Sequence, residues 1–306
     1  MKIGQDEYKI GEGEPEFTVN FKRPVSMHSL MTSTSLALGE AYMDGDLEIE
    51  GDLYHALNHF LGQMGKFSTN EKALRKLIFP SMSRKNQEKE VQSHYDIGND
   101  FYRLWLDDTM SYSCGYFQNE NDTLKQAQAG KVDYILRKAN LKEGMHLLDI
   151  GCGWGFLLME AARKYGVHGM GITLSKEQYK EFQHRIKEEH LEHLLEVRLM
   201  DYRGLPKYGK LFDRVVSIGM VEHVGRGKYE EFMGCVKSVL KPGGIFLLHF
   251  ISGLKEYPGD AWIKNISSPE EWFQACAATF MNGVIDLHQI IFTNDVNNEL
   301  PMTKWY

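Results

Sequence analysis

Long hydrophobic runs are absent from this sequence of 306 residues. The longest, residues 245–251, contains His249 and falls far short of the roughly 20 residues that cross a bilayer, so we interpret it as a buried strand. The polar, acidic N-terminus lacks the apolar core of a signal peptide, which argues against export. Both absences favour a protein that stays in the cytoplasm.

Cysteine and positive net charge are also scarce. The four cysteines, Cys114, Cys152, Cys235 and Cys276, are scattered without the spacing of metal ligands, so we expect no metal site and a reduced compartment. The formal net charge of −7 argues against a nucleic-acid binder. The remaining composition, 42% apolar and 25% charged, is ordinary for a globular protein large enough for two domains.

Three regions differ in character along the chain. Residues 1–61 form a separate unit in which a strand ends near residue 21 and a helical hairpin begins near residue 36, which predicts a small N-terminal α/β domain. Residues 62–90 mix basic and apolar side chains, a pattern typical of helices on anionic lipid surfaces and also of a solvated linker helix, which we favour on this pattern alone. Residues 91–306 form the main domain.

From residue 145 onwards, strand-like and helix-like segments alternate. The expected strands lie near 145–150, 167–172, 194–199, 213–218 and 243–250. The expected helices between them lie near 156–165, 176–189 and 227–240. This alternation predicts an α/β fold, a mostly parallel sheet with helices on both faces. Residues 241–244, Lys-Pro-Gly-Gly, are expected to form the turn that ends the last helix and starts the fifth strand.

The most informative segment is Leu147–Gly155, with the sequence LLDIGCGWG. An apolar strand runs into a glycine-rich turn, and a helix-like run follows at once. Glycines are needed where the backbone bends sharply and approaches a ligand with no side chain between them. This order predicts a cofactor site at the carboxyl end of a parallel sheet, although an ordinary tight turn shares the pattern.

The next strands also end in polar residues. The second expected strand ends at residues 173–175 without the carboxylate that binds ribose in nicotinamide enzymes, which weakens a dehydrogenase hypothesis. Gln178 lies one helical turn beyond Leu174, so both face the same cleft. Asp201 and Tyr202 follow the third strand, where they suit either an adenine contact or a simple strand-end turn.

Two titratable side chains lie near the ends of neighbouring strands: Glu222 follows the fourth expected strand, and His249 lies near the end of the fifth. Glu222 and His249 are expected at the same edge of the sheet and could converge on one polar ligand, although a lone histidine in an apolar strand is more often a core residue. Upstream, residues 93–102 and 110–117 are dense in aromatic and hydroxyl side chains. Such a segment forms either the wall of a partly apolar pocket or an aromatic layer over the sheet.

Together, these motifs closely resemble those of the cyclopropane-fatty-acid synthase family, which are class I S-adenosylmethionine-dependent methyltransferases. The resemblance covers residues 92–262, and residues 36–52 resemble that family's N-terminal domain. It rests on residues 94–102, 112–114, 148–155, 171–175, 178, 222–225 and 246–249. It implies a Rossmann-like methyltransferase fold and transfer of a methyl group to a cis double bond of an unsaturated phospholipid, followed by closure of a cyclopropane ring.

The resemblance also implies roles for single residues. The S-adenosylmethionine contacts would fall on Tyr112, Ser113, Asp149, Gly151, Gly153, Thr173, Leu174, Gln178, Asp201 and Tyr202. In this family the base is a bound bicarbonate, which would be held by the backbone of Cys114, Glu222, His249 and the backbone of Ile251. We expect His249 to be the cationic imidazole beside that anion. The basic stretch 66–89 predicts peripheral contact with the anionic inner face of a membrane, and the family's habit implies a homodimer.

The chain departs from the family after about residue 264. Residues 265–275 do not match the glycine- and proline-rich turn expected there, a segment carrying a bicarbonate-binding tyrosine is missing, and residues 277–293 resemble the family's C-terminal end. We hypothesise a frame slip with an internal loss of several dozen codons, and a shortened N-terminus. We therefore expect a helix at 269–281, a last strand at 284–292 antiparallel to the fifth with an exposed apolar edge, and cofactor binding more readily than turnover.

Two other functions stay open. The chain could be a methyltransferase for a small polar acceptor, with Glu222 and His249 as general base, but the aromatic segment and the basic linker then have no obvious use. It could also be a non-catalytic remnant that binds S-adenosylmethionine without turnover.

Overall fold

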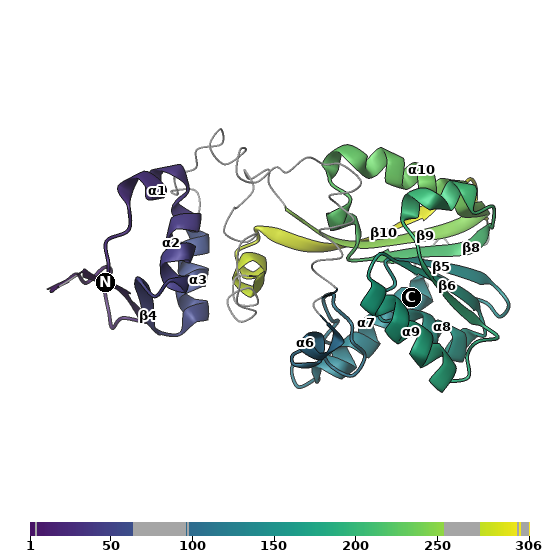
Figure 1. Ribbon diagram of the computed structural model, residues 1–306, viewed down its shortest axis with the longest axis horizontal. Helices are drawn as coiled ribbons and strands as arrows, with labels where there is room; N and C mark the ends of the chain where they lie inside the picture. Colours follow the sequence, from purple (N-terminus) through teal and green to yellow (C-terminus); the bar gives the residue numbers. More distant parts are fainter. Residues whose placement is uncertain (4, 64–95, 97, 254–275, 299, 301–305) are drawn as a thin grey trace. The chain divides into compact units, whose positions relative to one another are not determined.

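The computed structural model describes residues 1–3, 5–63, 96, 98–253, 276–298, 300 and 306 (Figure 1). The chain divides into two compact units, one combining 1–81 with 252–286 and the other combining 82–251 with 287–306. The sequence analysis placed residues 252–286 in the main domain, whereas Ala278 packs against Leu57 and Leu61 of the first unit. The basic segment 62–90 lies almost entirely outside the described residues, so its conformation remains a prediction.

The smaller unit is a four-stranded sheet with helices packed on it, which agrees with the expected α/β fold. The strand order is β2-β1-β3-β4. The elements are β1 (Lys2–Ile3), β2 (Asp6–Glu7), β3 (Phe17–Phe21), α1 (Met27–Thr32), α2 (Thr34–Met43), β4 (Leu47–Gly51) and α3 (Leu53–Gly62). Its core contains Val19, Ala41 and Leu47, and α3 begins where the Asp52 carboxylate accepts the His55 N–H at 2.9 Å.

The larger unit is built on a six-stranded sheet in the order β10-β9-β8-β5-β6-β7. Its strands are β5 (His146–Ile150), β6 (His168–Thr173), β7 (Leu195–Leu199), β8 (Phe212–Ile218), β9 (Leu240–Gly253) and β10 (Ile285–Thr293). Strands β5 to β9 pair in parallel, and the order reverses between β5 and β8. Such a reversal is where open parallel sheets bind ligands.

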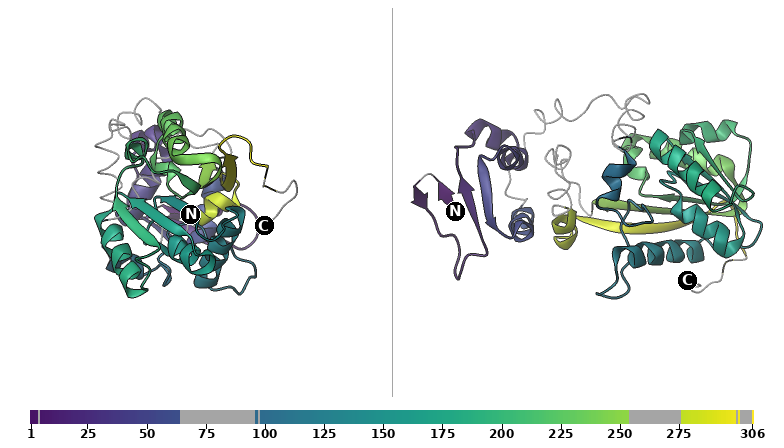
Figure 2. Two further views of the ribbon diagram at one scale, coloured as in Figure 1. Left: turned by 90° about the vertical axis from the view of Figure 1, so that its right-hand side faces the viewer. Right: turned by 60° about the horizontal axis from the view of Figure 1, so that its bottom comes forward.

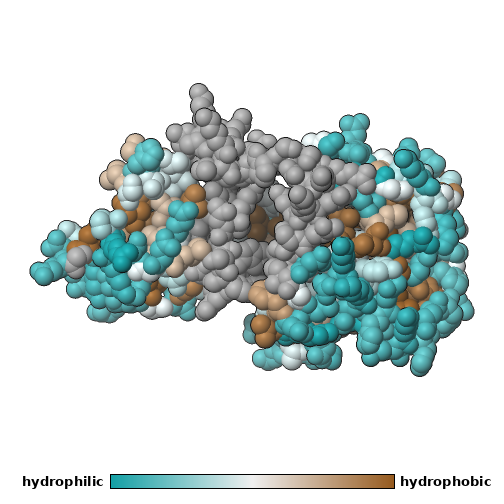
Figure 3. Space-filling model, in the orientation of Figure 1, coloured by the Kyte–Doolittle hydropathy of each residue, from teal (hydrophilic) through white to brown (hydrophobic). Residues whose placement is uncertain are grey.

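Helices cover both faces of this sheet, as the three views show (Figures 1 and 2). They are α6 (Asn99–Arg103), α7 (Leu124–Lys138), α8 (Phe156–Tyr165), α9 (Lys176–Glu188) and α10 (Tyr229–Val239), with the short 3-10 turns η2 (Tyr202–Lys207), η3 (Val221–His223) and η4 (Arg226–Lys228). Leu147 packs under α7, α8 and α9, whereas its neighbour Leu148 packs under α10, because successive side chains of a strand point to opposite faces. The surface over α8 and α9 is mostly hydrophilic (Figure 3).

The end of the sheet differs in detail from the prediction. Strand β9 begins at Leu240, which pairs with Phe212, so the glycine turn lies inside the strand as a register shift. β10 lies beside β9 and runs antiparallel to it, since Gly243 contacts Asn294 while His249 contacts Gln289. Within the described residues β10 is the outer strand, as expected. Of the helix expected at 269–281, residues 276–281 are described and helical.

Within the part of the chain that the structure describes, every helix is too short or too polar to traverse a bilayer. The same residues contain no cluster of histidine, cysteine or carboxylate side chains suited to a metal ion.

Candidate functional site

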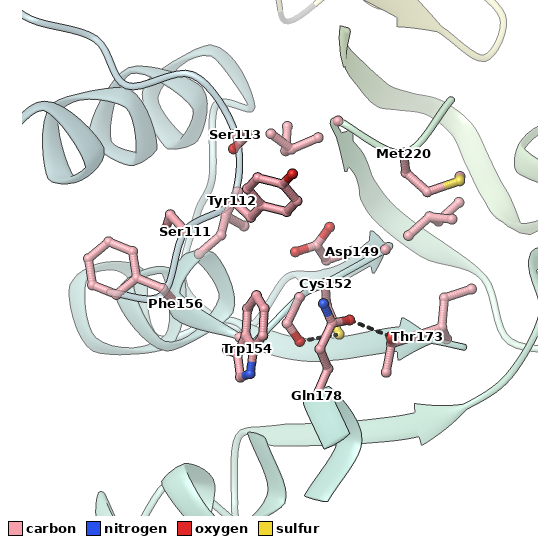
Figure 4. Close-up of a pocket in the computed structure, with 18 of the residues that line it drawn as sticks. Ser111, Tyr112, Ser113, Asp149, Cys152, Trp154, Phe156, Thr173, Gln178 and Met220 are labelled. Atoms are coloured by element: carbon pink, nitrogen blue, oxygen red, sulfur yellow. Dashed lines mark hydrogen bonds between the residues drawn. The ribbon is translucent and has the colours of Figure 1, made fainter. Parts of the chain in front are cut away.

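A cleft opens at the carboxyl ends of β5, β6, β7 and β8, where the strand order reverses. It holds about 1160 Å³ of empty space, part of it open to solvent. Side chains from the loop before α7, the turn after β5 and the segments after β6 and β8 surround it (Figure 4). It is lined by all ten residues that the resemblance assigned to a cofactor: Tyr112, Ser113, Asp149, Gly151, Gly153, Thr173, Leu174, Gln178, Asp201 and Tyr202.

The glycine-rich turn after β5 presents backbone to this cleft. Gly151 has a φ of 85°, in the left-handed region that favours glycine. A Cβ at this position would lie 2.8 Å from Cγ of Met220, which follows β8. The N–H groups of Gly151 and Cys152 donate to the Ile172 carbonyl at 2.9 and 3.1 Å. Strand β6 therefore holds the turn in a shape that leaves room beside its backbone.

Asp149 is the buried carboxyl of the site. It is 3% exposed, and its Oδ1 has no hydrogen-bond partner within the described residues. Burial raises the pKa of Asp149 to about 7, and the Lys131 ammonium opposes that rise. Figure 4 shows this carboxyl between Tyr112 and Gln178. A buried carboxyl of this kind is suited to a cationic ligand group, since a positive partner would favour its ionised form.

Thr173 and Gln178 form a second polar element. The Thr173 hydroxyl donates to Oε1 of Gln178 at 2.8 Å and accepts the Ser175 N–H at 3.1 Å. The Ser175 hydroxyl in turn caps α9 by accepting the Gln178 N–H at 3.2 Å. Because its oxygen is occupied, the Gln178 amide presents its nitrogen to the cleft as a donor (Figure 4).

Asp201 and Tyr202 lie at the end of the cleft formed by η2. Both Asp201 oxygens accept from the Arg203 guanidinium, at 2.8 and 2.6 Å, and one of them also accepts the Arg203 N–H. Burial raises the pKa of Tyr202 to about 12, so its phenol is neutral, and its ring packs edge-on against Phe232. The sequence analysis missed Arg203, which holds Asp201 in place.

The aromatic upstream segment forms both a wall and a packing layer. Tyr112 lines the cleft, whereas Tyr102 is 1% exposed and packs behind Tyr112 with ring centroids 5.7 Å apart. The segment is tied to two of the ligand loops, since Asp96 accepts the Ser175 hydroxyl at 2.6 Å and Asn99 accepts the Trp154 indole N–H at 2.7 Å. The two alternatives from the sequence are therefore both correct.

A buried lysine holds the loop that carries Tyr112 and Ser113. Lys131 of α7 is 3% exposed and donates to the Ser113 hydroxyl at 2.6 Å and to Oε1 of Gln128 at 2.5 Å. The Gln128 amide donates to the carbonyls of Ser113 and Ser111 at 2.8 and 3.3 Å. Burial lowers the pKa of Lys131 to about 8. The sequence analysis missed this clamp, although both residues share a helix face with Val132 and Ile135.

A second polar group lies beside the cleft, where β8 and β9 end. Oε1 of Glu222 accepts the Ile251 N–H at 2.9 Å, and the Gly219 N–H donates to the His249 carbonyl at 2.8 Å. Burial raises the pKa of the Cys114 thiol. The Lys131 charge lowers this pKa and the Glu222 charge raises it. Although Glu222 is exposed overall, desolvation of its carboxyl raises its pKa. The structure thus brings Glu222 of η3 into contact with Ile251, which lies on β9 two residues after His249.

The prediction that the His249 imidazole is cationic is wrong for this structure. His249 is 2% exposed, and burial lowers its pKa to about 4, with Lys131 and Lys138 contributing in the same direction. At neutral pH the positive charges near this group therefore lie on two lysines of α7, and the imidazole is neutral. Both lysines are more than 100 residues before His249, so the sequence pattern around the histidine gave no sign of them.

A mostly parallel sheet with this order, a glycine-rich turn after its first strand and a cleft at the reversal point together define the Rossmann-like fold of class I S-adenosylmethionine-dependent methyltransferases. The chain belongs to the mycolic acid cyclopropane synthetase family, whose model matches residues 82–266. Residues 4–72 match a separate model, described as a domain of unknown function (DUF7884).

Two curated relatives and two solved structures illustrate the similarity. A probable fatty acid methyltransferase of Pseudomonas putida is 38% identical over 78% of this chain and 60% of its own length. The cyclopropane-fatty-acyl-phospholipid synthase of Escherichia coli K12 is 37% identical over 84% of this chain and 67% of its own length. The chain thus spans about three fifths to two thirds of these relatives.

Among structures, the cyclopropane synthase MmaA2 of Mycobacterium tuberculosis superposes with a TM-score of 0.60 and 29% identity, over 67% of this chain and 98% of that one. The mycolic acid cyclopropane synthase CmaA1, complexed with SAH and CTAB, superposes with a TM-score of 0.52 and 38% identity, over 63% of this chain and 66% of that one.

Proposed function

We propose that this protein transfers a methyl group from S-adenosylmethionine to a cis double bond of an unsaturated phospholipid acyl chain, which then closes to a cyclopropane ring. The observation that carries the proposal is the cleft lined by ten motif residues, one of which is the buried carboxyl of Asp149 with no described partner for its Oδ1. Support comes from the phospholipid synthase named among its relatives and from CmaA1, whose structure contains SAH.

The chemistry of the lining fits S-adenosylmethionine. Its cationic amino group suits the Asp149 carboxyl, and its hydroxyl and carboxylate oxygens suit the donors of Gln178 and Ser113. S-adenosylmethionine supplies an electrophilic methyl group on a positively charged sulfur. Tyr112 places an aromatic ring in the same cleft, where it would attract that charge.

The aromatic layer behind Tyr112 serves the same reaction, because water would trap a carbocation formed on the lipid. Tyr102, Met110 and Trp154 are each no more than 3% exposed, and Trp105 packs on Tyr112 with ring centroids 5.1 Å apart. These residues keep water out of one side of the cleft.

The group beside the cleft fits bicarbonate. Nε2 of His249 is buried without a described partner, and the raised pKa of Glu222 allows that carboxyl to share a proton instead of repelling an anion. The Ile251 N–H donates to Glu222 in this structure and would turn to the anion when the anion binds. The backbone of Cys114 completes the proposed set. Bicarbonate would supply the base that takes the proton lost on ring closure.

Thr173→Val is expected to weaken S-adenosylmethionine binding about tenfold, since the Gln178 amide loses the hydrogen bond that fixes its orientation. Titration calorimetry would measure the dissociation constant. Thr293→Val, at an exposed position on the edge strand, is the matched control and should bind as the wild type does. An unchanged affinity in a folded Thr173→Val protein would contradict the assigned role of Gln178.

The function is tested with methyl-labelled S-adenosylmethionine and vesicles of unsaturated phospholipid, with and without added bicarbonate. We expect label in the lipid, as a cyclopropane, and more of it when bicarbonate is present. Binding without transfer would instead support a non-catalytic remnant, and label on a small polar acceptor would support the other methyltransferase hypothesis. Saturated phospholipid vesicles are the control and should take no label.

We also propose peripheral attachment to the cytoplasmic face of a membrane through the basic stretch 66–89, and assembly as a homodimer. The vesicles of the transfer assay test the first point by sedimentation. The basic side chains of that segment should retain more protein on anionic than on neutral vesicles. Equal retention on both would count against it.

A further inference from the structure

A continuous hydrogen-bonded chain runs from α7 through β10 to His249. The Lys138 ammonium donates to Oε1 of Gln289 at 2.6 Å, and Nε2 of Gln289 lies 2.9 Å from Nδ1 of His249. Nε2 of His249 is buried and has no partner within the described residues. The proposed reaction assigns no role to Lys138 or Gln289, and neither belongs to the lining of the cofactor cleft in the described structure.

The chemistry of the amide decides the tautomer of the imidazole. A side-chain amide nitrogen donates and does not accept, so Nδ1 of His249 must be the acceptor. A neutral imidazole carries one proton, which must then sit on Nε2. Burial and the neighbouring lysines keep this imidazole neutral, as described above.

Lys138 fixes which end of the amide faces the histidine. If the Gln289 amide turned over, its nitrogen would face the Lys138 ammonium, placing two donors together. Lys138 is 7% exposed, and its Nζ lies 4.2 and 4.6 Å from the ring centroids of Tyr134 and Tyr306. These cation–π contacts hold the ammonium against Gln289.

We propose that Gln289 is a positioning residue, which, held by Lys138, keeps His249 as the Nε2–H tautomer and so supplies a buried N–H donor for the anion beside Glu222 and Ile251. The inference rests on the proposed function for the identity of that anion, but the tautomer itself does not depend on it. In this arrangement the imidazole binds the anion as a neutral donor, and the lysines of α7 carry the charge.

The tautomer is measured by nitrogen and carbon NMR of protein with isotope-labelled histidine, and the His249 signal is assigned by its loss in His249→Asn. We expect the Nε2–H form in the wild type. In Gln289→Glu, a carboxylate pairs with Lys138 and accepts a hydrogen bond from an Nδ1–H group, so the Nδ1–H or doubly protonated form should replace it. In Lys138→Leu, the amide is free to turn over, and both tautomers should appear.

Activity adds a second readout. Gln289→Glu should lower kcat about tenfold or more, the cost of one misdirected buried hydrogen bond, while the dissociation constant for S-adenosylmethionine stays that of the wild type. Gln183→Glu makes the same change at an exposed position of α9 and should alter neither the His249 signal nor kcat.

An Nδ1–H signal in the wild-type protein would overturn the proposal, and so would an unchanged His249 signal in folded Gln289→Glu. If Gln289→Glu fails to fold, the wild-type and Lys138→Leu spectra still decide the question. A wild-type protein with the Nε2–H form but no transfer to lipid would refute the proposed function and leave the tautomer assignment standing.

Discussion

Asp149→Asn is expected to weaken S-adenosylmethionine binding about 30-fold or more, because a cationic ligand group would lose a buried charged partner. In the wild type, affinity should increase from pH 6 to pH 8, as the carboxyl with a pKa of about 7 ionises. The variant should lack that dependence. Calorimetry at several pH values would measure both effects, with Asp133→Asn, on the half-exposed side of α7, as the control.

The same substitution should stabilise the protein at alkaline pH. The folded-state pKa of Asp149, about 7, lies above the ordinary 3.8, so its contribution to stability is fully present below about pH 4 and is lost as the pH rises through 7. Asparagine does not titrate. Relative to the wild type, the unfolding free energy of the variant should therefore rise by about 4 kcal/mol between these limits, of which about 3 kcal/mol falls above pH 5. Urea unfolding at pH 5 and pH 8 would test it, and a difference that does not change with pH would contradict the buried carboxyl.

Gly155→Ala is expected to have the largest effect on folding. Gly155 caps the N-terminus of α8 with a φ of 88°, and a Cβ there would lie 2.1 Å from the ring of Phe182. Phe182 of α9 is fully buried in the core together with residues of α8, so the ring has no room to move. Strain and overpacking together should cost about 4 kcal/mol, measured as the free energy of unfolding in urea.

Two further variants make this prediction specific. Gly153→Ala also changes a left-handed glycine, but a Cβ there meets no atom within 4 Å, so it should cost only about 1 kcal/mol. Combining Gly155→Ala with Phe182→Leu should recover part of the loss, since the clash is with that ring. Equal destabilisation by the two single alanine variants would show that backbone strain, and not the ring, decides the cost.

The core of the fold was predictable from periodicity. The five parallel strands lie within a few residues of their expected positions, and α8 has the expected bounds, because glycine turns and apolar runs are strong local signals. The start of β9 was not predicted, since residues 241–244 carry strong turn signals. In the structure the strand continues through them by a register shift against β8.

The site was predictable where a motif carried it. The ten residues assigned through motifs line one cleft, but their binding roles remain predictions. Lys131, Lys138 and Gln289 were not found, because a basic or amide residue on a helix or edge strand usually faces solvent. Their effect on His249 arises only when α7 and β10 pack against β9, and that information is not local to any of the three segments.

The clamp formed by Lys131 and Gln128 makes one wall of the cleft more rigid than the wall that faces it. The wall formed by Ser111–Ser113 is held to α7 by buried hydrogen bonds. The facing wall includes Met220, whose unbranched thioether side chain changes its conformation at a small cost in free energy. The rigid wall should therefore fix the position of a ligand, and the flexible wall should adapt to its shape. Analogues of S-adenosylmethionine with added bulk should therefore bind only when the added group faces Met220.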